Sequence, residues 1–211
     1  MTQLSGSVDL EIHGNTAHLI LNRPEKLNAM TVKMDEEINS YIYEINNNLE
    51  IRAVVLYGKG EKGFCAGSDL TDLGDYGTNW EYRNRFDRNL DYARAIWLIK
   101  KPVVAAVHGW VVGGGLEMTC ASDIRIGTPD SKFLAGEIRW GWHGGSGQTQ
   151  LLTHTVGPGN ANLFLLHGEK VEAFVDRKWK HGNTKPELVA SITNGYNDMG
   201  MPTWKGILSP K

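Results

Sequence analysis

Alternating apolar and polar residues near the N-terminus predict two short strands, Val8–Ile12 and Thr16–Leu21, joined by a turn at Gly14-Asn15. The next residues, 22–28, interrupt this pattern with a proline and polar side chains, which is typical of a loop. From Thr31 onward, apolar residues recur mostly at three- and four-residue intervals, so an amphipathic helix is predicted. The residues that set this spacing are Val32, Met34, Ile38, Ile42 and Ile45.

Farther along the chain, apolar runs alternate with helical patterns. Ala53–Tyr57 and Val103–Val107 are typical of buried strands, and Asp123–Ile126 predicts another strand. The charged, amphipathic stretch from Trp80 to Lys100 predicts one helix, and three glycines open a second helix over Leu116–Ala121. This order of elements predicts an α/β fold in which helices cover largely parallel strands.

Composition narrows the function without identifying it. The 211 residues suit one domain, although two small domains are also compatible with this length. A formal net charge of −2 provides no broad basic surface for nucleic acid and no attraction to a membrane. The polar N-terminus lacks a signal pattern, and no apolar run approaches the ~20 residues of a membrane span. Because two cysteines are also too few for a disulfide framework, we expect a cytoplasmic protein.

One glycine motif is misleading. Residues 58–63 (Gly-Lys-Gly-Glu-Lys-Gly) match the spacing of a dinucleotide-binding turn after a strand. That turn must open directly into a helix, whereas residues 64–69 (Phe-Cys-Ala-Gly-Ser-Asp) have a loop-like composition. We therefore do not expect a dinucleotide site.

Two other glycine-rich segments, Phe64–Leu70 and His108–Glu117, each follow a predicted buried strand. Glycine permits sharp turns and lets a ligand approach the main chain closely. Placed side by side, the two turns would aim two backbone N–H groups at one oxygen, which is the geometry of an oxyanion hole. Taken alone, however, the glycines favour tight loops between packed elements.

Glu117 and Glu137 are the candidate acid and base. Glu117 falls in the first turn of a predicted helix, where a carboxylate is also simply a good partner for the helix dipole. Glu137 lies in a segment rich in glycine and tryptophan, residues 136–142. The chain between them is long enough to bring both side chains to one cleft, where desolvation would raise their pKa values.

Several motifs occur in an order that is specific as a set. They are Asn22-Arg23-Pro24, Leu27–Met30, Phe64–Leu70, Lys101–Gly109, Gly113–Glu117, Ser122–Ile126, Phe133, Glu137-Ile138, Gly141 and Gly144–Gln150. On these motifs, residues 10–171 resemble the crotonase (enoyl-CoA hydratase/isomerase) superfamily. The resemblance implies a crotonase-like ββα superhelix and activity on an acyl group held as a coenzyme A thioester, in fatty acid metabolism.

The resemblance also implies roles for particular residues. In that family two backbone N–H groups stabilise the thioester enolate, and the matching positions are Ala66 and Gly114. Its hydratases use two glutamates around a water, matched here by Glu117 and Glu137, and the Gly145 N–H matches a group that helps to hold this water. This chemistry requires no metal and no further cofactor.

The coenzyme A contact region implied by the resemblance lies in two loops. Its matching residues are Lys26, Leu27, Ala29, Ala66 and Asp69, with Lys26 able to meet a phosphate. The partners implied are therefore an acyl-CoA substrate and further copies of the chain, in a homotrimer or a dimer of trimers, with no nucleic acid and no membrane.

The chain departs from the family pattern around the second glutamate. Gly136 stands where the family usually has proline, and Gln148 replaces a glycine. Aromatic side chains also enter this region, and they either narrow the acyl pocket or pack in the core. They are Trp110, Trp140, Trp142 and His143.

The C-terminal region departs further. We predict a core domain over residues 1–171 and a C-terminal helical region over 172–211, which is shorter than in the family. Either the chain is naturally short there or an internal surface segment is missing from the sequence, and we favour the second explanation.

The residues leave three functions open. A hydratase or dehydratase acting on a 2-enoyl-CoA comes first, because both carboxylates are in place. An isomerase or thioester hydrolase of the same superfamily needs the oxyanion hole with a different acid and base. A non-catalytic protein that binds CoA esters is the third.

Overall fold

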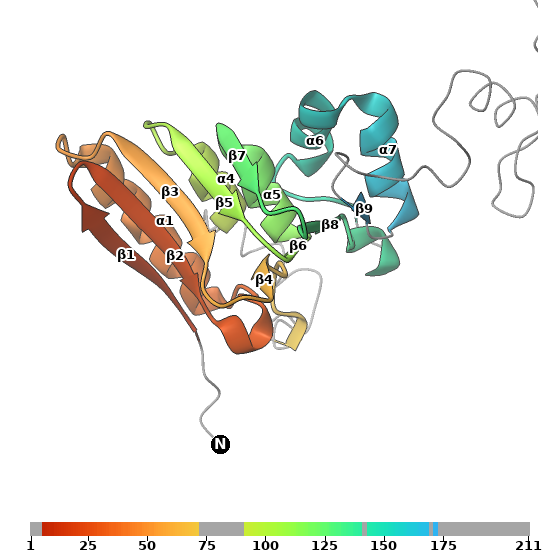
Figure 1. The fold of residues 1–211 in the computed structure, drawn as a ribbon, viewed down its shortest axis with the longest axis horizontal. Helices are drawn as coiled ribbons and strands as arrows, with labels where there is room; N and C mark the ends of the chain where they lie inside the picture. Colours follow the sequence, from red (N-terminus) through yellow and green to blue (C-terminus); the bar gives the residue numbers. More distant parts are fainter. Residues whose placement is uncertain (1–5, 72–90, 141–142, 169–170, 173–211) are drawn as a thin grey trace, which may run out of the picture. The chain divides into compact units, whose positions relative to one another are not determined.

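The computed structural model describes residues 6–71, 91–140, 143–168 and 171–172. Within these ranges the larger sheet has the strand order β1-β2-β3-β5-β7 (Figure 1). Its strands are β1 (Ser7–His13), β2 (Thr16–Asn22), β3 (Ala53–Gly58), β5 (Val103–Val107) and β7 (Ile124–Gly127). Only the β1–β2 pair is antiparallel, and every other neighbouring pair in this sheet is parallel. The predicted hairpin, the buried strands and the largely parallel α/β architecture are thus confirmed.

A smaller sheet brings the two glycine-rich turns together. Its order is β4-β6-β8-β9, formed by Gly63–Cys65, Trp110–Val112, Lys132–Leu134 and Val171–Glu172. Because β4 and β6 are parallel neighbours, with Cys65 opposite Val111, their carboxyl ends meet at the same edge. The two glycine-rich segments overlap these strands and turn directly after them, so the sheet places the two turns side by side. The sequence patterns did not predict these very short strands.

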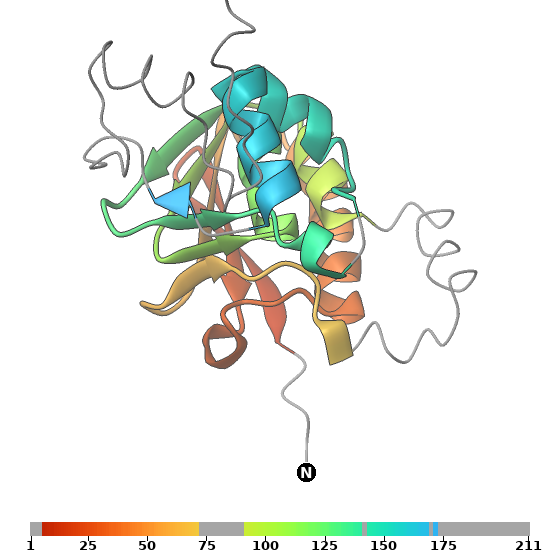
Figure 2. The same ribbon diagram turned by 90° about the vertical axis from the view of Figure 1, so that its right-hand side faces the viewer.

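Among the described residues there are five helices, of which the first three pack toward the larger sheet. They are α1 (Val32–Asn47), α4 (Tyr92–Trp97), α5 (Gly114–Ala121), α6 (Gln148–Val156) and α7 (Pro158–His167), with 3-10 turns η1 (Pro24–Lys26) and η2 (Glu137–Trp140). Helix α1 begins where its pattern predicted, because the Thr31 hydroxyl accepts the Met34 N–H and caps the first turn. Helices α6 and α7 pack against each other beyond α5 (Figures 1 and 2). Of the helix predicted over residues 80–100, the structure forms Tyr92–Trp97, and residues 80–90 lie outside the described ranges.

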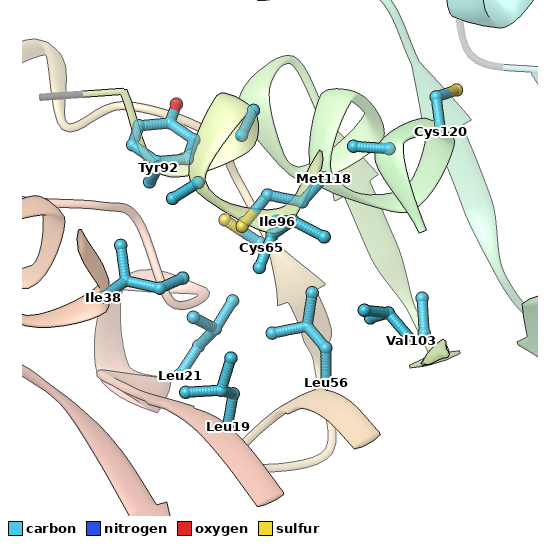
Figure 3. Packing of buried hydrophobic residues seen from close by; sticks show 14 of the residues in the cluster. Leu19, Leu21, Ile38, Leu56, Cys65, Tyr92, Ile96, Val103, Met118 and Cys120 are labelled. Atoms are coloured by element: carbon cyan, nitrogen blue, oxygen red, sulfur yellow. The ribbon is translucent and has the colours of Figure 1, made fainter. Parts of the chain in front are cut away.

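The core lies between the larger sheet and helices α1, α4 and α5. Leu19, Leu56 and Met118 are fully buried there, and the Tyr92 ring packs over the same cluster (Figure 3). The Tyr92 hydroxyl points away from the leucines (Figure 3). This orientation directs a polar group from the core toward the turns that follow β4 and β6.

Two further expectations have structural outcomes. β3 leads through a bend into β4 and not into a helix, so residues 58–63 do not form a dinucleotide-binding turn. Among the described residues, no helix is long and apolar enough to cross a membrane. The division at residue 171 stays a prediction, because residues 173–211 lie outside the described ranges.

Candidate active site

The turn after β4 lies against the start of helix α5. Gly67 has a φ of +83°, a conformation that side chains strongly disfavour. A Cβ on this residue would stand 3.0 Å from the Gly114 nitrogen and 3.1 Å from the Val112 carbonyl oxygen. Glycine at this position therefore allows the turn to contact the first N–H groups of α5, where the helix dipole is positive.

The Ala66 N–H does not face an open space. It donates to the Leu27 carbonyl at 2.9 Å, so in this structure it is not free to hold a thioester oxygen. The next N–H, of Gly67, is directed at the Cys65 sulfur at 3.4 Å. For Ser68 and Gly114, no hydrogen bond from the N–H is found within the described residues. Ser68, which the motif comparison did not single out, is thus the better candidate partner for Gly114.

Tyr92 links these two residues. Its hydroxyl lies 2.8 Å from the Ser68 Oγ, and a Cβ on Gly114 would stand only 1.8 Å from the same hydroxyl. The space beside Gly114 is therefore filled by Tyr92, which gives a direct reason for glycine at this position. The sequence could predict Tyr92 only as a residue on the apolar face of a helix, because its contact partners lie far away along the chain.

The two predicted glutamates lie in the same neighbourhood. Glu117, on the buried first turn of α5, accepts the Gly145 N–H on its Oε1 at 2.8 Å. Glu137 begins η2, and its Oε1 lies 3.0 Å from the point where a Cβ on Gly113 would stand. Both carboxyl groups thus adjoin the N-terminal turn of α5. The Gly145 N–H binds the Glu117 carboxylate itself, whereas the family pattern had suggested that it holds a water.

One side of the glutamate pair has unsatisfied polar atoms. Gln148 donates through Nε2 to Glu137 Oε1 at 3.4 Å. Within the described residues, the buried Glu137 Oε2 and Gln148 Oε1 have no hydrogen-bond partner. Buried polar atoms are normally paired, and an exception at a candidate site indicates a place for a water or a ligand group.

The environment of the two glutamates favours their protonated forms. Burial above all, together with the charges of Glu137 and Asp91, raises the pKa of Glu117 to about 8, against the lowering effect of the Gly145 N–H and the Ser146 hydroxyl. Burial also raises the pKa of Glu137. Glu117 therefore keeps its proton near neutral pH, and the two neighbouring carboxyl groups can both give and accept protons.

The predicted coenzyme A contacts fall on two adjoining segments. The bond from Ala66 to Leu27 joins the η1 loop to the turn after β4. Leu27 and Asn28 both have positive φ, and the buried Asn28 amide holds this shape by donating to the carbonyls of residues 59, 63 and 64. Lys26 is exposed and Ala29 is partly buried, so Lys26 can reach a phosphate in solvent.

Asp69 has a structural role. Its carboxylate pairs with Arg23 at 2.5 Å, and both side chains are buried. Burial by itself would raise the pKa of Asp69, but hydrogen bonds from Thr71 and Arg23 outweigh it and lower the pKa to about 2. The Asp69 carboxylate is therefore engaged in its own ion pair, and the coenzyme A contact predicted at Asp69 stays a prediction.

The aromatic residues near Glu137 do not behave alike. Trp140 is exposed and not part of the core, and Trp110 lies under the Lys132 ammonium at 5.3 Å. His143 is exposed, with its Nδ1 near the Gly144 carbonyl, and Trp142 lies outside the described residues. Core packing thus does not explain Trp140 or His143.

Comparison with known proteins agrees with this geometry. The family model described as enoyl-CoA hydratase/isomerase matches residues 11–179. The short-chain-enoyl-CoA hydratase of Clostridium acetobutylicum is 36% identical over 79% of this chain and 64% of its own length. The mitochondrial enoyl-CoA hydratase of Pongo abelii is 36% identical over 75% of this chain and 54% of its own length.

A solved structure gives the same result. The enoyl-CoA hydratase from Bacillus anthracis superposes with a TM-score of 0.71 at 30% identity, over 80% of this chain and 65% of that one. This likeness supports the largely parallel α/β fold over the matched part. The chain spans less than two thirds of the length of each of these three relatives.

Proposed function

This chain belongs to the enoyl-CoA hydratase/isomerase family, and from that premise we propose that it adds water to, or eliminates it from, a 2-enoyl-CoA thioester. The observation that carries the proposal is the glutamate pair beside the first turn of α5. The carboxyl group of Glu117 is hydrogen-bonded, whereas that of Glu137 keeps a buried oxygen with no hydrogen-bond partner in the part of the chain that the structure describes. A water between them would complete that oxygen's hydrogen bonding.

In this proposal, backbone N–H groups stabilise the enolate. In the proposed complex the thioester oxygen accepts from the N–H groups of Ser68 and Gly114, and the helix dipole of α5 adds favourable potential. Two such preorganised donors are each worth about 2.7–4 kcal/mol in the transition state. Because these donors are fixed by the fold, they require no rearrangement when negative charge develops.

Proton transfer falls to the glutamates. One carboxylate removes a proton from the water as its oxygen attacks C3, and the other carboxyl group delivers its proton to C2. The proton that Glu117 keeps near neutral pH, together with the neighbouring carboxyl group of Glu137, supplies this acid and this base. No other group is needed to balance the protons.

Substrate binding and assembly complete the proposal. We infer that the coenzyme A portion lies along Lys26, Leu27, Ala29 and Ala66, with Lys26 meeting a phosphate, and that the reaction uses no further cofactor. A homotrimer or dimer of trimers in the cytoplasm is proposed from the family alone. Light scattering at micromolar concentration tests the assembly, and a stable monomer would contradict it.

The test of function is an absorbance assay that follows loss of the conjugated double bond of crotonyl-CoA. We expect turnover by the parent chain and strong loss in Glu137→Gln. Turnover that is undiminished in this variant would favour an isomerase or a thioester hydrolase. Tight binding of a CoA ester without turnover of any enoyl-CoA would favour the non-catalytic reading.

A further inference from the structure

The N-terminal cap of α4 contacts the acid and base side of the site. Asp91 caps this helix, since its Oδ1 accepts the N–H groups of Ala93 and Arg94 at 3.1 and 2.9 Å. The same carboxylate accepts the Ser146 hydroxyl, at 2.8 Å on one oxygen and 2.9 Å on the other. These bonds connect helix α4 to a loop that lies 55 positions later in the chain.

Ser146 is held in an unfavourable backbone conformation. Its φ is +47°, a region that residues with a Cβ rarely adopt, and Gly147 follows at +80°. Such a conformation persists only when its surroundings fix it. The Ser146 hydroxyl is in hydrogen-bond distance of both Asp91 oxygens, so this carboxylate holds the side chain in place.

The residue before Ser146 makes the contact that matters for chemistry. The Gly145 N–H donates to Glu117 Oε1 at 2.8 Å. The direction of this N–H depends on the backbone of the neighbouring Ser146. A chain of contacts therefore runs from Asp91 through Ser146 and Gly145 to the carboxyl group of Glu117.

We propose that Asp91 is a positioning residue for the reaction proposed above: it fixes Ser146, so that the Gly145 N–H stays directed at Glu117. Asp91 does not reach the reacting atoms and acts only through the loop and through its charge. The proposal deepens the hydratase assignment and rests on it for its catalytic meaning. Its structural part concerns Glu117 and Gly145 alone and does not depend on turnover.

The charge of Asp91 gives a second, separable effect. The groups acting on Glu117 are the carboxylates of Glu137 and Asp91, the Gly145 N–H and the Ser146 hydroxyl. Burial, and in addition the Glu117 charge, raises the pKa values of the Cys65 and Cys120 thiols. Of these groups, only Asp91 combines a negative charge with a direct bond to the loop that holds Glu117.

Two variants separate position from charge. Asp91→Asn keeps a helix cap and an oxygen that accepts the Ser146 hydroxyl, but it removes the charge. We expect its Glu117 pKa, followed by ¹³C NMR of the carboxyl carbon and assigned with Glu117→Gln, to fall below that of the parent. Its kcat/KM should then decline at lower pH than in the parent, with KM for the CoA ester nearly unchanged.

Asp91→Ala removes the bonds as well. We expect faster amide exchange at Gly145, and a kcat lower by up to about 10²-fold, the typical effect of misplacing a reacting group by about 1 Å. Asp123→Asn is the matched control: Asp123 accepts the Val103 N–H at 2.8 Å, a bond that asparagine can keep. It should change neither the Glu117 pKa nor Gly145 exchange.

Specific results would overturn the proposal. It fails if Asp91→Asn leaves the Glu117 pKa at the parent value, or if Asp91→Ala leaves both Gly145 exchange and kcat unchanged. If the parent chain turns over no enoyl-CoA, the hydratase assignment fails, while the NMR measurements still decide whether Asp91 positions Glu117.

Discussion

The buried ion pair between Arg23 and Asp69 gives a prediction whose size follows from the structure. Arg23 is only 5% exposed and Asp69 only 8%. The Arg23 guanidinium also donates to the Ala29 carbonyl, so the pair joins the η1 loop to the turn after β4. A fall of the Asp69 pKa from 3.8 to about 2 corresponds to about 2 kcal/mol of stabilisation at neutral pH.

Asp69→Asn should therefore lower the free energy of unfolding at pH 7 by about 2–4 kcal/mol, the upper part reflecting a buried guanidinium left without its carboxylate. Because the folded pKa is depressed, this stabilisation is present above pH ~4 and is lost as the pH falls toward 2. The measurement is urea unfolding of parent and variant at pH 7, 5 and 3. The difference between the two chains should shrink at the lowest pH.

A matched control uses the same arginine. Glu25 lies 4.0 Å from the Arg23 Nε, but its side chain is 45% exposed. Solvent screens such a pair, so Glu25→Gln should cost less than about 1 kcal/mol. An Asp69→Asn variant no less stable than Glu25→Gln, or a difference from the parent that does not vary with pH, would refute the reasoning.

Three further predictions concern the candidate active site. Glu117→Gln and Glu137→Gln should each lower kcat by about 10²–10⁴-fold, because glutamine keeps the shape of the side chain and removes proton transfer. Calorimetry should show a nearly unchanged affinity for the CoA ester. Weaker binding that accounts for the lost rate would argue against a role in proton transfer. The parent kcat/KM should decline as the pH rises through about 8, where Glu117 loses its proton, and a profile flat to pH 10 would contradict this. Gly114→Ala should displace the Tyr92 hydroxyl, break its contact with Ser68 and lower the free energy of unfolding by about 1–3 kcal/mol. In the double variant with Tyr92→Phe, part of this loss of stability should be recovered, because the clashing hydroxyl is removed.

Local patterns in the sequence were enough to predict much of the fold. The period of two in residues 8–21 and the helical spacing after Thr31 gave elements that match β1, β2 and α1 closely. These signals are reliable because each is set by neighbours along the chain and by one buried face. The three-residue strands β4, β6 and β8 were not predicted, because a strand this short shows no recognisable alternation of apolar and polar residues.

The ordered motifs also located the site. They indicated the two turns, Glu117 and Glu137, and the structure brings these segments together around the first turn of α5. The resemblance assigned an N–H group to Ala66, whereas the tertiary structure uses that N–H to bind Leu27. A motif specifies which residues turn, but the direction of each N–H depends on the carbonyl groups that the folded chain brings near.

Only the tertiary structure decided the partners across long stretches of chain. Arg23 meets Asp69 from 46 positions away, and Ser146 meets Asp91 from 55 positions away. The sequence does not reveal these pairings, because hydrogen bonds and charge effects depend on distance in space and on burial. The raised pKa values of Glu117 and Glu137 have the same origin: the sequence supplies two acids, and their burial in the folded chain raises both pKa values.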